Sequence, residues 1–180
     1  MQVTNYGARV VSLWTPDRAG DYEDIVLGYE TIDRYINNDG ERFLGAVVGP
    51  YANRIAKGRF RLDGTEYNLP INNNGQTLHG GIDGLDRVVW DVVSASEDQL
   101  VMKYLHADGQ EGFPGNLQIE MTYSLTPENE FGIDYSATTD KPTVVNRSHH
   151  PFFNLKGEGN GTILDHVMTI NASHTTPVDS

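Results

Sequence analysis

Alternating apolar and polar residues dominate the middle of the chain. In Leu117–Leu125 every second residue is apolar, and the same pattern returns over residues 131–137. A period of two is typical of β-strands that bury one face. A proline-containing turn at residues 126–130 separates the two segments. Together they predict an antiparallel hairpin.

A second hairpin is predicted over residues 60–67, where Asp63-Gly64 supplies the positive φ angles of a tight turn. Helical signal is limited to a turn or two around residues 31–35. Further short strands are predicted at residues 8–14, 25–27, 88–93, 100–105, 143–147 and 166–170. Many short strands separated by Gly, Pro and Asn predict an all-β sandwich.

Residues 1–180 are predicted to form a single domain, because no linker, repeat or low-complexity tract divides them. Three long glycine-rich loops are expected within it, at residues 47–58, 71–84 and 107–116. Loops of this length in a compact domain are more often functional than idle.

The charge balance is strongly acidic, with 13 Lys and Arg against 25 Asp and Glu and a net charge of −12. Such a surface repels nucleic-acid phosphates and anionic lipids, so we expect neither nucleic-acid nor membrane partners. The chain has no cysteine, which excludes disulfides and thiolate metal sites. The first residues lack a signal-peptide pattern, so a cytoplasmic location is expected.

The most informative segment is residues 145–155, Val-Asn-Arg-Ser-His-His-Pro-Phe-Phe-Asn-Leu. It places His149 and His150 beside an aromatic pair at the end of a predicted strand. A histidine can exchange a proton near neutral pH. Aromatic faces beside hydrogen-bonding groups suit a sugar-sized polar ligand. A core strand with one structural histidine is the alternative for this segment taken alone.

Two loops carry further candidate binding groups. Asn53-Arg54 places an amide beside a guanidinium, and the pair offers directional donors to neighbouring hydroxyls. His79 precedes Gly80-Gly81, which let the backbone come close to a ligand. Taken singly, each of these residues could also only brace its loop.

In this order and spacing, the sequence resembles the aldose 1-epimerase family over essentially its whole length. The resemblance rests on residues 5–8 with 16–18, then 51–60, 78–81, 108–116, 137–142, 145–155 and 163–166. It implies a galactose-mutarotase-like β-supersandwich of mostly antiparallel strands. It also implies a cofactor-free enzyme that interconverts the α and β anomers of free hexoses such as galactose or glucose by acid–base ring opening. A small-molecule sugar is then the expected partner, with no cofactor and no metal.

The resemblance assigns roles to four residues. His150 matches the family's proton donor, and Asn53, Arg54 and His79 match its substrate-binding residues. Adjacent residues of an extended strand point to opposite faces, so we expect His149 to be structural.

Two departures from the family pattern stand near the donor. Pro151 and Phe152 replace the family's serine and tyrosine. Loss of the tyrosine hydroxyl removes one possible hydrogen bond and bears on sugar preference.

Members of this family are nearly twice as long, and their glutamate base lies in the later half. We therefore expect the chain to be the N-terminal portion of the family domain, incomplete at its C-terminal side, with the base beyond Ser180. Recruitment of a base from Glu111, Asp83 or Asp165 is less expected, since loop carboxylates are usually solvated. The isolated chain would then be inactive for lack of the base.

An incomplete sandwich would also leave inward-facing residues of the central hairpin without cover. Ile119, Met121 and Tyr123 are the expected examples. Exposed apolar faces and bare strand edges favour self-association, so we expect oligomers or poor solubility.

Two other functions stay open from the residues. The chain could be a non-catalytic carbohydrate-binding module of the same fold. Alternatively, His79, His149 and His150 could ligate a metal in a cupin-like barrel. The compact His-x-His pattern with a nearby carboxylate, typical of a cupin, is absent from the sequence.

Overall fold

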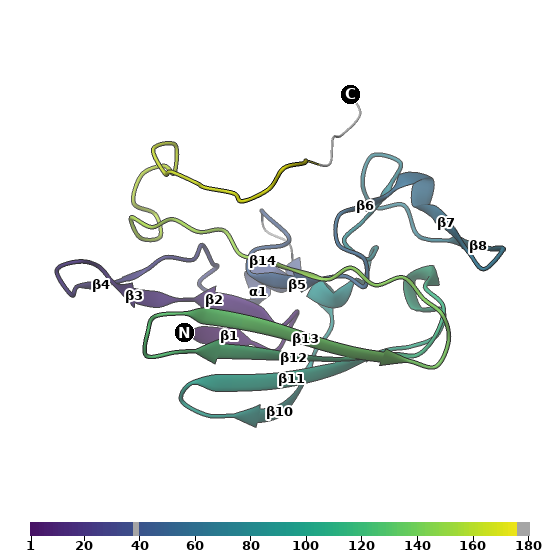
Figure 1. Ribbon diagram of the computed structural model, residues 1–180, viewed down its shortest axis with the longest axis horizontal. Helices are drawn as coiled ribbons and strands as arrows, with labels where there is room; N and C mark the ends of the chain where they lie inside the picture. Colours follow the sequence, from purple (N-terminus) through teal and green to yellow (C-terminus); the bar gives the residue numbers. More distant parts are fainter. Residues whose placement is uncertain (38–39, 176–180) are drawn as a thin grey trace.

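The largest sheet of the molecule is a four-stranded antiparallel meander (Figure 1). The structure is a computed structural model that describes residues 1–37 and 40–175. The meander consists of β10 (Asp91–Ala95), β11 (Gln99–His106), β12 (Leu117–Leu125) and β13 (Phe131–Thr139). The predicted central hairpin is confirmed, because β12 and β13 pair in register over their full lengths.

The apolar face of β12 forms part of the core. Its alternating residues are buried, as its period of two predicts. The expectation that Ile119, Met121 and Tyr123 lose their cover is wrong. They pack in one cluster with residues such as Val10 and Trp90, which come from outside the strands β11 to β13. The N-terminal strands and the segment before β10 supply this cover.

Short two-stranded pairs surround the meander, and every strand pairing within the described ranges is antiparallel. The second predicted hairpin is confirmed as β7 with β8, and the predicted helical turn as α1 (Ile32–Asn37). The pairs are β1 (Gln2–Thr4) with β2 (Arg9–Ser12), β3 (Trp14–Pro16) with β4 (Tyr22–Asp24), β5 (Ala46–Val48) with β14 (Ser148–His150), β6 (Arg54–Ile55) with β9 (Thr77–Leu78), and β7 (Arg59–Leu62) with β8 (Thr65–Asn68). Among the described residues, three 3-10 turns complete the elements: η1 (Ala56–Gly58), η2 (Leu85–Arg87) and η3 (Gln110–Gly112).

Three predicted strands are wrong. Residues 25–27 and 143–147 contribute single bridges, Val26 to Phe153 and Asn146 to Tyr51. Residues 166–170 form no strand at all. Apolar, β-branched residues favour a strand only where a neighbouring strand accepts their backbone hydrogen bonds.

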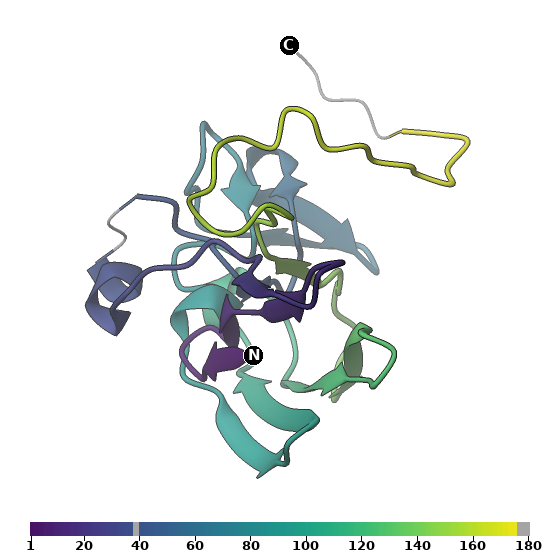
Figure 2. The same cartoon turned by 90° about the vertical axis from the view of Figure 1, so that its left-hand side faces the viewer.

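The final described segment runs away from the sheets, as the yellow trace in Figure 2 shows. Leu164 and Val167 in this segment are at least 90 % exposed. The exposed apolar surface that we expected on β12 therefore lies here instead. Within the described ranges, no helix has both the length and the apolar character needed to cross a membrane.

Candidate active site

The pairing of β5 with β14 decides where the two adjacent histidines point. His149 lies against the rings of Tyr123 and Phe131, at centroid distances of 5.3 and 5.9 Å. Its Nε2 lies 3.0 Å from the carbonyl oxygen of Gly45, as expected for an N–H donor. His150 contacts His79 instead, so the prediction that the two side chains point to opposite faces is confirmed.

His150 instead faces His79, which comes from another pair of strands. The two imidazoles meet edge to face with centroids 5.1 Å apart. Phe43 contacts both of them, at 4.6 Å from His79 and 5.7 Å from His150. Phe152, which replaces the family's tyrosine, lies 5.2 Å from His150 on the partly exposed side. The candidate site is thus a pair of imidazoles with Phe43 against both rings and Phe152 against His150.

A reciprocal backbone contact fixes His79. The Asn53 backbone N–H donates to His79 Nδ1 at 2.9 Å, and the His79 backbone N–H donates to the Asn53 carbonyl at 3.0 Å. Both residues have positive φ angles, 63° for Asn53 and 53° for His79. Such backbone conformations in non-glycine residues concentrate at functional sites. Because Nδ1 accepts a hydrogen bond, the ring proton of neutral His79 sits on Nε2, where it can be donated to a ligand.

The surroundings of His79 keep its ring neutral. Burial, and then the charges of His150, Arg54 and Arg42, lower the pKa of His79 to about 4. A group in this state is a hydrogen-bond donor without charge at neutral pH. It therefore adds no positive charge beside His150.

Arg54 is exposed, and two hydrogen bonds hold its side chain. Its Nη1 donates to the side-chain oxygen of Asn53 at 3.2 Å, and its Nε donates to the side-chain oxygen of Asn73 at 3.1 Å. The pairing of β6 with β9 places Arg54 opposite Leu78, the residue before His79. The four predicted site residues, Asn53, Arg54, His79 and His150, are therefore brought together in one place.

Sequence reasoning missed Phe43 and Arg42. Phe43 precedes the apolar run of β5 and looks like an ordinary core residue. Its guanidinium neighbour Arg42 carries no local signal, since the groups it binds lie about forty positions away along the chain. The aromatic residue next to a predicted buried strand was the one available hint.

The carboxylates considered as substitute bases are engaged elsewhere. Glu111 accepts a hydrogen bond from the Ile82 backbone N–H at 2.6 Å. Asp83 pairs with Arg87 at 3.8 Å, and Asp165 pairs with Lys156 at 2.7 Å.

The three histidines of the cupin hypothesis do not converge on one point, since His149 faces the core and the other two face each other. Among the described residues, no group of three or more His, Cys, Asp or Glu side chains could hold a metal ion. The hypothesis of a cupin-like metal site is therefore not supported.

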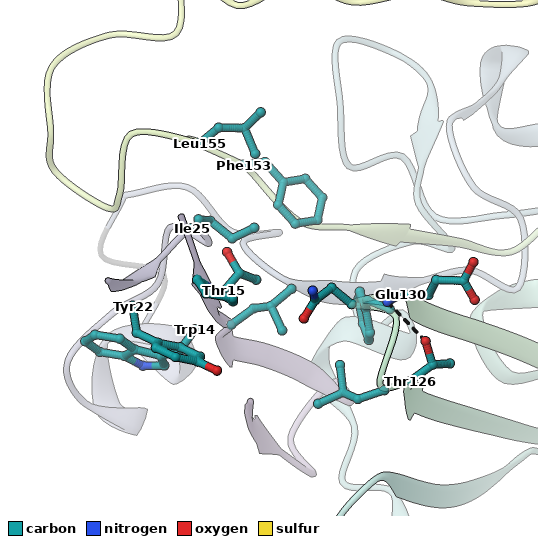
Figure 3. A pocket seen from close by; sticks show the side chains of 13 residues that line it. Trp14, Thr15, Tyr22, Ile25, Thr126, Glu130, Phe153 and Leu155 are labelled. Atoms are coloured by element: carbon teal, nitrogen blue, oxygen red, sulfur yellow. Dashed lines mark hydrogen bonds between the residues drawn. The ribbon is translucent and has the colours of Figure 1, made fainter. Parts of the chain in front are cut away.

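A groove of about 530 Å³ lies away from the histidine pair (Figure 3). Trp14 and Tyr22 stand at one end of it, and Phe153 and Leu155 project from above. The groove is mostly apolar, and the four predicted site residues do not line it. The size of the groove alone is no reason to place the candidate active site in it.

Comparisons with known families match the model described as aldose 1-epimerase to residues 1–180. The galactose mutarotase of Rattus norvegicus is 40% identical over 179 residues, which cover 99% of this chain and 51% of that protein. The aldose 1-epimerase of Escherichia coli K12 is 38% identical over 175 residues, covering 97% and 50%. The chain thus spans about half the length of the curated relatives it matches.

Solved structures agree with the all-β fold. The aldose epimerase homologue from C. elegans superposes with a TM-score of 0.81 at 32% identity, covering 87% of this chain and 47% of that one. The galactose 1-epimerase from Lactobacillus acidophilus NCFM superposes with a TM-score of 0.72 at 31% identity, covering 85% and 45%. The galactose-mutarotase-like β-sandwich expected from the sequence is confirmed.

Proposed function

The chain belongs to the aldose 1-epimerase family, and from this membership we propose that it carries the proton-donor and sugar-binding side of a mutarotase site. In this reaction a base removes the proton from the C1 hydroxyl while an acid protonates the ring oxygen, so that the ring opens. Rotation about the C1–C2 bond and closure then give the other anomer. The chemistry needs an acid and a base on either side of one carbon.

His150 is the proposed acid. The observation that carries this assignment is its position, turned away from the core and against the neutral ring of His79. In this proposal His79 Nε2, Arg54 and the Asn53 amide donate hydrogen bonds to sugar oxygens. These donors would hold the sugar while His150 delivers its proton to the ring oxygen.

The base is proposed to lie outside these 180 residues. Glu111, Asp83 and Asp165 are each held by another group, so each would need to break a contact to serve. The lengths of the relatives are compatible with further chain that supplies a carboxylate. The isolated 180-residue chain is then expected to bind sugar without accelerating anomer exchange.

A free hexose is the proposed substrate. Relatives carry the names galactose mutarotase and galactose 1-epimerase, which makes galactose the first sugar to test and glucose the second. The non-catalytic binding module is not favoured, because these relatives are named as enzymes. The cytoplasmic location and the absence of a cofactor stay predictions.

Polarimetry on freshly dissolved α-galactose and α-glucose tests the proposal, with the natural protein at its full length. We expect the protein to speed equilibration and His150→Asn to remove that acceleration. The matched control is His149→Asn, the same substitution one residue earlier, which should keep the acceleration and lose stability instead. An unchanged rate in His150→Asn would contradict the assignment of His150 as the proton donor.

A further inference from the structure

Arg42 binds three groups of one loop at once. Its Nε donates to Asp86 Oδ2 at 2.8 Å and its Nη2 donates to Asp86 Oδ1 at 3.0 Å. The same Nη2 also donates to the carbonyl oxygens of Ile82, at 2.9 Å, and Gly81, at 3.3 Å. This guanidinium therefore ties down the loop that follows His79. A planar fork of donors is needed for such a set of acceptors.

Arg42 also covers the aromatic ring that separates it from the histidines. Its guanidinium lies over Phe43, 4.8 Å from the ring centroid. The Phe43 ring in turn contacts both His79 and His150. Arg42 thus acts on His79 along two routes, through the loop on one side and through the Phe43 ring on the other.

The partner of Arg42 is anchored in the core. Asp86 is fully buried, and so is Arg9, whose Nη2 donates to the Asp86 carbonyl at 2.9 Å. Arg9 Nη1 also donates to the carbonyls of Arg42 and Leu44, at 2.9 and 3.0 Å. The turn that carries Phe43 and the loop after His79 are therefore fixed to the same buried pair. A buried network of this kind favours one arrangement over alternatives.

We propose that Arg42 is a positioning residue for the histidine pair, holding Phe43 and the Gly80–Gly84 loop so that His79 and His150 keep their spacing. The inference rests on the proposed function and goes beyond it, since Arg42 touches neither imidazole and no sugar-binding role is given to it. Sub-ångström placement of reacting groups has large effects on rate, so loss of this brace should lower kcat/KM by roughly tenfold or more.

An ordinary structural ion pair is the competing account, and the chain offers a matched control for it. Arg87 belongs to the same loop and also pairs with an aspartate, its Nη1 lying 3.8 Å from Asp83 Oδ1. Its side chain is 26 % exposed, against 18 % for Arg42. Arg87→Met removes an arginine–aspartate pair without touching the Phe43 brace.

The test compares Arg42→Met, Arg42→Lys and Arg87→Met in the natural protein at full length. Polarimetry gives KM and kcat, and NMR titration of the ring protons gives the pKa of His79. The charged or titratable groups that act on His79 are His150, Arg54 and Arg42. Arg42→Met should therefore raise the pKa of His79 as well as lower kcat/KM. Arg42→Lys keeps a cation, so it should keep that pKa low but restore only part of kcat/KM.

Arg87→Met should leave kcat/KM and the pKa of His79 as they are in the unchanged protein. If Arg42→Met alters the melting temperature alone, with wild-type kcat/KM and a wild-type His79 titration, the positioning role is overturned. If Arg42→Met does not fold, Arg42→Lys decides, and full wild-type kcat/KM in that variant would overturn the role. An unchanged protein that fails to speed mutarotation contradicts the proposed function, whereas the His79 titration still tests the brace.

Discussion

His79 and His150 stand edge to face with their ring centroids 5.1 Å apart, although they come from two different pairs of strands. His150 ends the strand that pairs with β5, whereas His79 follows the strand that pairs with β6. The contact therefore depends on how these two small sheets pack. It places His150 beside an imidazole whose lowered pKa, about 4, keeps it uncharged at neutral pH.

Tyr123→Phe should destabilise the protein by about 1–3 kcal/mol. The buried Tyr123 hydroxyl donates to the carbonyl of Ala8 at 2.7 Å, and its removal leaves that carbonyl without this donor. Tyr135→Phe is the matched control, since the buried Tyr135 hydroxyl has no partner in the part of the chain that the structure describes. Urea unfolding should show a change within about 0.5 kcal/mol for the control. Equal losses in both variants would contradict the role of the Ala8 contact.

Gly80→Ala should disturb the site far more than Gly75→Ala. Both glycines have positive φ angles, 92° and 79°. A Cβ at Gly80 would overlap the carbonyl oxygen of Gly49, whereas a Cβ at Gly75 would meet nothing within 4 Å. Both variants carry the backbone cost of about 1 kcal/mol, and Gly80→Ala adds the steric overlap next to His79. Melting temperatures and sugar affinity by calorimetry check this, and similar values for the two variants would be the contrary result.

Stability should fall as the pH is lowered from about 6.5 toward 4. Burial lowers the pKa of His106 to about 4, and His79 and His149 have pKa values lowered to about 4 as well. In this window the unfolded chain binds protons that the folded chain does not, so acid favours unfolding. Among the described residues, neither ring nitrogen of His106 has a hydrogen-bond partner.

The unfolding free energy that the protein loses on acidification should therefore be smaller in His106→Leu, by up to roughly 3 kcal/mol. Urea unfolding at neutral pH and near pH 4.5 measures the difference. His174→Leu, the same substitution at an exposed position, is the matched control. A His106→Leu protein as acid-sensitive as the unchanged chain would show that His106 is not among the groups responsible.

The isolated chain should self-associate. Within the described ranges, β10 pairs with β11 on one side and with no strand on the other, and its Val92 and Val93 are exposed. Free strand edges beside apolar side chains are templates for association. Sedimentation velocity should show larger species as concentration rises, and Val93→Lys should reduce them. A single species at all concentrations would argue against this surface.

The sequence predicted those parts of the fold whose signal lies within a few residues. The β12–β13 hairpin carries its own alternation, and the opposite directions of His149 and His150 follow from the geometry of one strand. Residues 166–170 are also rich in apolar residues and yet form no strand. A strand depends on its neighbour, and local residues do not encode where that neighbour lies.

The candidate site, too, could be predicted from the sequence only in part. Asn53, Arg54, His79 and His150 could be singled out because each lies in a recognisable short segment. The hydrogen bond from the Asn53 backbone to His79 could not be predicted, because it depends on how two loops meet. The brace formed by Arg42 was missed for the same reason, since it binds groups on a distant loop.

The pairing of β5 with β14 has a consequence for the order of folding. His149 bonds to Gly45 across 104 positions of chain, whereas the strands of the meander follow one another directly. Closing a long loop costs more entropy than closing a hairpin, so contacts of this kind form late. We expect the meander to form first and the two imidazoles to meet in the last steps. Ring-current shifts of His79 and His150 would then time the completion of folding, after the β-sheet signal in circular dichroism has already appeared.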